Sequence, residues 1–281
     1  MKVLGIHGIG NLREGKEPEI ASQMSALWAQ YLTEGGTPGS DVRVTYYADL
    51  LQEEGHQGED GRLEDLSDAE SQFLADVFDQ QELPEPVGVA QGWLTFLLRT
   101  QMQDIVASKA CSPGVMEWFM VRWAREVCLY LQPSAAREAV QKRVREAIAA
   151  HQPDVVIAHS LGSVIAYEVL HNCRDIQVPL LVTLGSPLAL PKTVFPRLTP
   201  SPGHGRGKKP QAVHRWANLA DPGDLVAVPV KGISRRFDGV ESDQHCSVHQ
   251  TYRFHHVEQY LKTPKLARLL ASVPTSDEQP A

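Results

Sequence analysis

The chain of 281 residues is 42% hydrophobic and 22% charged and carries a formal net charge of −7. This composition is that of a folded globular protein and excludes collagen-like, disulfide-scaffold and disordered classes. The acidic balance also argues against a nucleic-acid binder, which needs a basic surface to neutralise phosphates.

The first ten residues hold only a short apolar run, too short for a secretory signal, and no run approaches the eighteen apolar residues that a membrane span needs. The four cysteines, at positions 111, 128, 173 and 246, show no CxxC spacing and predict free thiols. We therefore expect a cytoplasmic protein without a membrane span.

The first half of the chain predicts a strand, a turn and a helix, followed by a second strand and an insertion. Residues 2–6 are an apolar run, residues 19–34 repeat apolar side chains at helical spacing, and residues 42–46 alternate apolar and polar side chains. Residues 50–85 hold twelve Asp and Glu against one Arg, a local charge of −11, which predicts a solvated excursion from the core with helical patches at best. Residues 91–131 predict two aromatic-rich helices that form a cap.

The second half alternates helices with apolar runs of the kind that buried parallel strands require. This alternation predicts a doubly wound, mostly parallel α/β sheet. Its core would comprise residues 1–50 and 132–281, and residues 51–131 would form an acidic linker and a helical cap or lid. The expected elements are a helix over 134–150 capped by Ser134, strands over 154–158, 178–184 and 213–219, and helices over 161–170 and 257–270.

The segment Ala158-His159-Ser160-Leu161-Gly162 lies between an expected buried strand and an expected helix. A nucleophile on such a turn needs small neighbours, because other backbone passes close by, and the helix directs free N–H groups toward it. An alternative is that Ser160 only caps the helix. His159 is expected to pack locally and not to act as a general base that takes the proton of Ser160.

This segment resembles the G-x-S-x-G nucleophile elbow of α/β-hydrolases, with Ala at the first Gly position. The loop His7-Gly8-Ile9-Gly10-Asn11 resembles the oxyanion loop of lipases and esterases, and Gly185-Ser186-Pro187 resembles a further segment of the same family. The resemblance covers residues 1–12, 154–190 and 212–265. It implies an α/β-hydrolase fold with Ser160 as nucleophile and the Ile9 and Leu161 amides as oxyanion donors, supported by His7, Gly8, His159 and Gly162. A phosphate-binding glycine loop fits residues 7–10 less well, because the segment matches neither G-x-x-x-x-G-K-[ST] nor G-x-G-x-x-G.

The acid and the base are expected later in the chain, in loops that follow strands. Asp224-Leu225-Val226 matches a D-x-V arrangement of lipase-like sequences, so Asp224 is preferred, while Asp221 is expected to cap the Pro-Gly turn. The segment from His256 to Leu261 resembles an H-x-x-x-Y-L pattern of bacterial lipase-like esterases, so His256 is the preferred base and His255 the next. The other late candidates are His245 and His249, and no zinc-site spacing is clear among these histidines.

We therefore expect a serine hydrolase that cleaves carboxylic esters, with lipid or acyl esters as candidate substrates, through an acyl-enzyme intermediate. The same residues also fit a thioesterase, an amidase or an acyltransferase, and the chain could instead be a catalytically silent binding protein. No cofactor or metal is implied. The expected partner is a small ester or acyl substrate, without nucleic acid. The aromatic insertion could line an acyl pocket, act as a lid, form a homodimer surface or consist of simple core helices.

Overall fold

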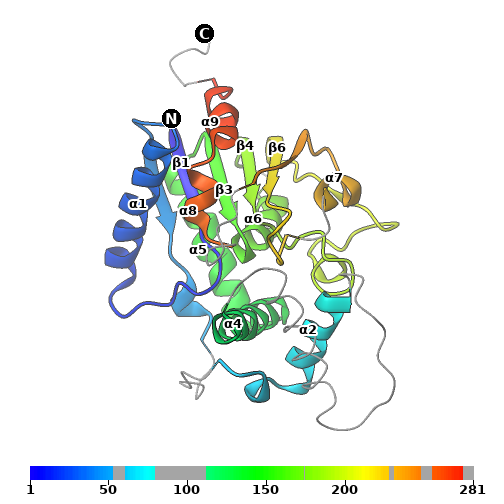
Figure 1. Cartoon of the computed structure of the whole chain (residues 1–281). Helices are drawn as coiled ribbons and strands as arrows, with labels where there is room; N and C mark the ends of the chain where they lie inside the picture. The colour runs from blue at the N-terminus through cyan, green and yellow to red at the C-terminus, as the bar shows by residue number, and fades with distance from the viewer. Residues whose placement is uncertain (53–60, 80–111, 174, 228–230, 248–254, 275–281) are drawn as a thin grey trace.

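A six-stranded sheet in which every neighbouring pair is parallel forms the centre of the protein (Figure 1). The structure is a computed structural model, described here for residues 1–52, 61–79, 112–173, 175–227, 231–247 and 255–274. The strand order is β2-β1-β3-β4-β6-β8. The strands are β1 (Lys2–Ile6), β2 (Asp41–Thr45), β3 (Val155–His159), β4 (Val178–Leu184), β6 (Val213–Ala220) and β8 (Ser242–His245).

Helices cover both faces of this sheet, so the prediction of an α/β protein with a mostly parallel sheet is confirmed. One hydrophobic core joins one face of the sheet to α1 (Glu17–Glu34), α8 (Val257–Leu261) and α9 (Pro264–Ala271). The other core joins the opposite face to α5 (Ala135–His151) and α6 (Leu161–Asn172). All five residues of β3 are buried, as its continuous apolar sequence requires.

The remaining elements are short and lie in the connections. Strands β5 (Gly207–Lys208) and β7 (Phe237–Asp238) form a separate two-stranded sheet. The short helices are η1 (Ala48–Leu50), η2 (Leu63–Asp65), η3 (Phe195–Arg197) and α7 (Gly232–Arg236).

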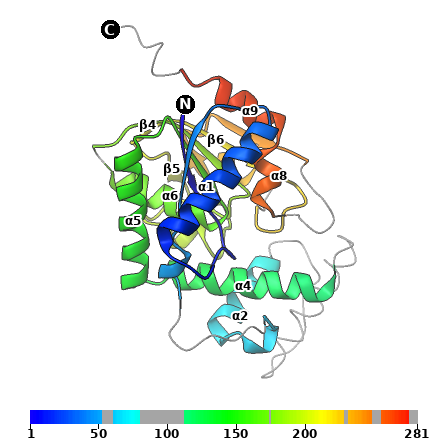
Figure 2. The ribbon, with the colours of Figure 1, turned by 90° about the vertical axis from the view of Figure 1, so that its left-hand side faces the viewer.

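Two helices of the insertion, α2 (Asp68–Asp79) and α4 (Pro113–Leu131), lie beyond the carboxyl ends of the strands (Figures 1 and 2). The expectation that residues 50–85 form a solvated excursion is wrong for α2. One face of α2 buries Phe73, Leu74, Val77 and Phe78, and its acidic side chains are on the other face. Of the expected aromatic pair, the helix over 113–131 is present, and residues 91–111 lie outside the described residues.

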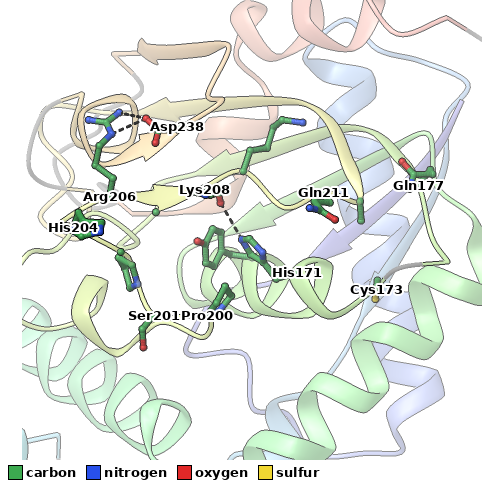
Figure 3. A pocket seen from close by; sticks show the side chains of 16 residues that line it. His171, Cys173, Gln177, Pro200, Ser201, His204, Arg206, Lys208, Gln211 and Asp238 are labelled. Carbon is green, nitrogen blue, oxygen red and sulfur yellow. Dashed lines mark hydrogen bonds and ion pairs between the residues drawn. The ribbon is translucent and has the colours of Figure 1, made fainter.

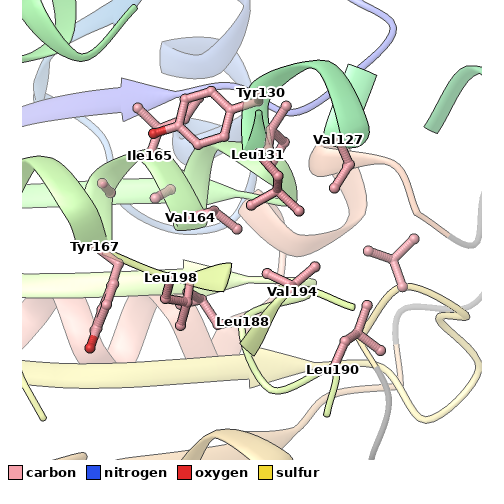
Figure 4. Close-up of a cluster of buried hydrophobic side chains, with 14 of the residues drawn as sticks. Val127, Tyr130, Leu131, Val164, Ile165, Tyr167, Leu188, Leu190, Val194 and Leu198 are labelled. Atoms are coloured by element: carbon pink, nitrogen blue, oxygen red, sulfur yellow. The ribbon is translucent and has the colours of Figure 1, made fainter. Parts of the chain in front are cut away.

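The insertion shares its hydrophobic core with the sheet. Side chains of α4 meet side chains of α6 and of the loop after β4 in one buried cluster, which includes Val127, Val164 and Val194 (Figure 4). On its other side α4 packs on α2, where the rings of Phe73 and Trp123 lie 5.2 Å apart. The position of α4 over the strand ends is therefore set by apolar packing on two sides.

The closing helix expected over 257–270 is two helices. Helix α8 ends at Leu261, and Thr263 caps α9, because its hydroxyl accepts from the Lys265 amide at 3.4 Å. Pro264 takes the first position of the new helix. The strand β8 was missed, because its sequence Ser-Asp-Gln-His has no apolar residue. It pairs on one side with β6, at the edge of the sheet.

Candidate active site

The loops after β1 and β3 meet at the point where the strand order reverses. From β1 the chain goes to β2 on one side and then returns to β3 on the other. In open parallel sheets such a reversal leaves a crevice at the carboxyl ends of the two strands. The two loops approach so closely that a Cβ atom built on Gly8 would lie 2.6 Å from Cβ of Ser160.

Ser160 has a strained backbone between β3 and α6. Its φ of 52° and ψ of −128° belong to a conformation that residues other than glycine rarely adopt. Its N–H donates to the Leu184 carbonyl at 3.0 Å, and its carbonyl accepts from the hydroxyl of Ser163 at 2.6 Å. The Ser160 hydroxyl makes no capping hydrogen bond, so the alternative that this residue merely caps the helix is wrong.

The residue two positions later must be glycine for these segments to pack. A Cβ atom on Gly162 would lie 2.4 Å from the carbonyl oxygens of both Ile6 and His7. Those oxygens belong to the end of β1 and to the loop that follows it. The sequence predicts that other backbone passes close to the turn at Ser160, and in the structure that backbone is the end of β1 and the loop after it.

Asp224 and His255 form a buried pair in which the carboxylate is fully hydrogen-bonded. Nδ1 of His255 lies 2.7 Å from Oδ2 of Asp224, and the Tyr260 hydroxyl donates to the same oxygen at 2.7 Å. The other carboxylate oxygen accepts from the Val226 amide at 3.0 Å. Asp221 instead accepts from the Gly223 amide at 2.6 Å, the turn-capping contact expected for it.

His255, and not His256, is the histidine that meets Asp224, so the preference for His256 is corrected. His256 is exposed and occupies the position before α8. The ring of His255 is buried and lies 4.7 Å from the ring of His159 and 5.5 Å from that of Phe119. Adjacent residues at the start of a helix point in different directions, and the sequence pattern selected the neighbour of the histidine that contacts Asp224.

The contact with Asp224 determines the tautomer of His255. A carboxylate only accepts hydrogen bonds, so in the neutral imidazole Nδ1 carries the proton and Nε2 keeps a lone pair. This Nε2 atom and Oγ of Ser160 are both buried, and neither has a hydrogen-bond partner among the described residues. The two atoms are thus not hydrogen-bonded to each other, but His159, which precedes Ser160, packs its ring 4.7 Å from that of His255. Buried polar atoms are rarely left unpaired, so both are candidates for chemistry at this end of the sheet.

His159 lies beside this pair as a neutral packing neighbour. Its ring is buried next to His255 and Tyr260, and burial together with nearby His255 holds the pKa of His159 well below its usual value. The expectation that His159 packs locally agrees with this position.

No family model, curated protein or solved structure matches the chain. The geometry of the site is therefore the basis for assigning its chemistry.

The loop after β1 is held by two side chains that fix one peptide group. Nε2 of His7 accepts from the Tyr47 amide at 3.2 Å, so its Nδ1 carries the proton and donates to the Gly8 carbonyl at 2.7 Å. Asn11 donates to the same carbonyl at 3.0 Å. In a trans peptide the C=O and N–H groups point in opposite directions, so these contacts turn the Ile9 N–H away from His7 and Asn11.

The neutral state of His7 predicts a pH-dependent stability. Burial lowers its pKa from 6.5 to about 4, so between these values the unfolded chain binds more protons than the folded chain. We expect this group to contribute a stability of about 3 kcal/mol above pH 6.5 that is lost as the pH falls toward 4. Urea unfolding of the native protein and of His7→Gln at pH 7 and pH 4.5 tests this. The variant should lose less stability on acidification, and equal losses would contradict the assignment.

Helix α4 touches both halves of the site. The Glu126 carboxylate accepts from the Gly10 amide, at 2.9 and 3.2 Å from its two oxygens, and Phe119 packs edge-on against His255. These two residues are seven positions apart and therefore lie on one face of the helix, about 10 Å apart along its axis. Burial raises the pKa of Glu126, despite the Gly10 amide and Arg122. One rigid element thus connects the loop after β1 to the buried histidine.

The described residues contain no group of three or more His, Cys, Asp or Glu side chains that could hold a metal ion. Across the same residues, no helix combines the length and the apolar character that crossing a membrane requires.

Proposed function

We propose that the protein is a serine hydrolase with an α/β-hydrolase fold, which cleaves carboxylic esters through Ser160, His255 and Asp224. The observation that carries this proposal is the pairing of Asp224 with His255, which leaves the buried Nε2 atom with a free lone pair. The second support is the strained backbone of Ser160, whose hydroxyl has no hydrogen-bond partner among the described residues.

In the proposed reaction, Nε2 of His255 takes the proton of the Ser160 hydroxyl while Oγ attacks the ester carbonyl. The amides of Ile9 and Leu161 donate to the oxyanion, and the Asp224 carboxylate stabilises the imidazolium. The intermediate collapses as the C–O bond to the leaving alcohol breaks, and His255 returns its proton to that alcohol. Water then repeats the sequence on the acyl-enzyme and releases the carboxylic acid.

The orientation of the oxyanion loop supports these roles. Neither the Ile9 nor the Leu161 amide donates to another residue in the described part of the chain, so both are available to a ligand. Leu161 begins α6, where the helix dipole favours negative charge. An oxyanion donor of this kind is worth about 3 kcal/mol in the transition state.

Glu126 is expected to hold the loop in its active position. Replacing Glu126 by Ala removes the acceptor of the Gly10 amide, and we expect kcat to fall about 10- to 100-fold with little change in KM, because small displacements of catalytic groups have such effects. Glu126→Gln keeps an acceptor oxygen and should retain most of the activity. Steady-state kinetics with p-nitrophenyl acetate measures both, and an equal loss in the two variants would contradict this role.

The first test is covalent labelling by a fluorophosphonate probe, which reacts with activated serines. The native protein should be labelled at Ser160, and neither Ser160→Ala nor heat-unfolded native protein should react. An unlabelled native protein would favour the silent binding protein instead. A chain-length series of p-nitrophenyl esters, with matching thioesters and amides, then gives the preferred bond and acyl length.

A further inference from the structure

A pocket lies at the opposite end of the sheet from Ser160. It encloses about 1020 Å³ beside the C-terminal end of α6 and the residues that precede β4 and β6 (Figure 3). Helix α6 begins directly after Ser160, and its twelve residues span about 18 Å. The pocket is therefore separate from the proposed active site and takes no part in its chemistry.

The lining of this pocket is strongly basic in an acidic protein. Residues 176–220 contain six Lys and Arg and no Asp or Glu, although the whole chain carries −7. The lining includes five basic or imidazole residues but a single carboxylate, that of Asp238; the five are His171, His204, Arg206, Lys208 and Lys209. A concave surface with one sign of charge concentrates ligands of the opposite sign.

Some of these side chains are held by contacts within the protein, and others are available to a ligand. Arg206 is paired with Asp238 at 2.6 Å and also donates to the Arg235 carbonyl, and the Lys209 ammonium donates to backbone carbonyls of β6. His171 donates to the Lys208 carbonyl at 3.0 Å (Figure 3). The side chains of Lys208 and His204 have no hydrogen bond or ion pair with another described residue, so their donors are available.

We propose that this pocket binds a phosphate-bearing small molecule, with Lys208 and His204 contacting the phosphate. The volume exceeds that of a bare phosphate and lies at the upper end for small-molecule sites. The remaining polar lining, which includes Ser201, Gln177 and Gln211, suits hydroxyl or amide groups on the rest of the ligand. A long polyanion fits less well, because the net charge of −7 repels it beyond the pocket.

Calorimetric titration of the full chain with pyrophosphate and with glucose 6-phosphate tests the proposal. We expect saturable binding at one site, weakened at least tenfold by Lys208→Glu and lessened by added salt. Lys142→Glu is the matched control, because Lys142 is an exposed lysine of α5 outside the pocket and the charge change is the same. Fluorophosphonate labelling of Ser160 should be equal in native protein and both variants, so failure of this proposal is distinguishable from failure of the proposed function.

Three results would overturn the proposal. The first is the absence of saturable binding at ligand concentrations up to about 10 mM. The others are an equal loss of affinity in Lys142→Glu, and binding to lipid vesicles without binding to either soluble phosphate. The last is measured by sedimentation with vesicles of phosphatidylglycerol and, as a neutral control, phosphatidylcholine. Protein that sediments only with phosphatidylglycerol, without binding either soluble phosphate, would make the basic pocket part of a membrane-contact surface.

Discussion

Replacing His255 by Ala is expected to lower kcat on p-nitrophenyl esters by about 10⁴- to 10⁶-fold, because the variant has no group to take the proton of Ser160. His256→Ala should change kcat less than about threefold, since His256 is exposed and the imidazole that meets Asp224 is that of His255. The two residues are adjacent and identical in type, so each variant is the control for the other. Steady-state kinetics and the rate of fluorophosphonate labelling measure both effects.

The opposite result would have a defined meaning. If His256→Ala lost activity and His255→Ala kept it, the Asp224–His255 pair would be a structural ion pair and the base would lie elsewhere. Loss in both variants together with a lower unfolding temperature would point to misfolding, so circular dichroism at increasing temperature belongs in the same experiment. Since the Asp224–His255 contact is buried, its loss is also expected to cost stability.

The parallel sheet could be predicted from the sequence because its strands are buried on both faces. Continuous apolar runs such as β3 and β4 are typical of strands buried on both faces, because no side of such a strand meets water. Their bounds differ from the predicted ones by a residue or less. The same reasoning failed for β8, where a polar edge strand is held by backbone pairing with β6 and needs no apolar side chain.

The candidate site was predictable as far as local backbone requirements reach. Ser160 and Gly162 stand out because a tight strand-to-helix turn tolerates few residue types. The choice between His255 and His256 depends instead on the start of α8 and on packing against Phe119, which are tertiary facts. The hydroxyl of Tyr260, which accepts from the Asp221 amide and donates to Asp224, was likewise missed as a positioning group, although its sequence pattern was noted.

Gly185 is required by the packing of the site, although the sequence around it indicates only a turn. Its φ is +52°, and a Cβ atom there would lie 2.8 Å from Oδ2 of Asp224 and 3.2 Å from the ring of His255. In the sequence, the Gly185-Ser186-Pro187 segment supports the fold but predicts no role. In the structure, its first residue leaves the space in which Asp224 and His255 meet.

Gly162→Ala is expected to destabilise the protein by about 2 to 3 kcal/mol and to abolish labelling of Ser160. The added methyl would lie 2.4 Å from the carbonyl oxygens of Ile6 and His7, and neither is the end of a flexible side chain. Relief requires that the end of β1 moves away from the elbow, which separates the Ile9 amide from Ser160. Urea unfolding and labelling by a fluorophosphonate measure the two effects.

Gly114→Ala is the matched control, because Gly114 is also the second residue of a helix and a Cβ atom there would meet nothing within 4 Å. That variant should be as stable as the native protein or up to about 1 kcal/mol more stable, since Ala is the better helix former. A Gly162→Ala protein with native stability and native labelling would show that β1 and the elbow are not in backbone contact. The oxyanion loop and the nucleophile would then lack the common anchor on which the proposed mechanism depends.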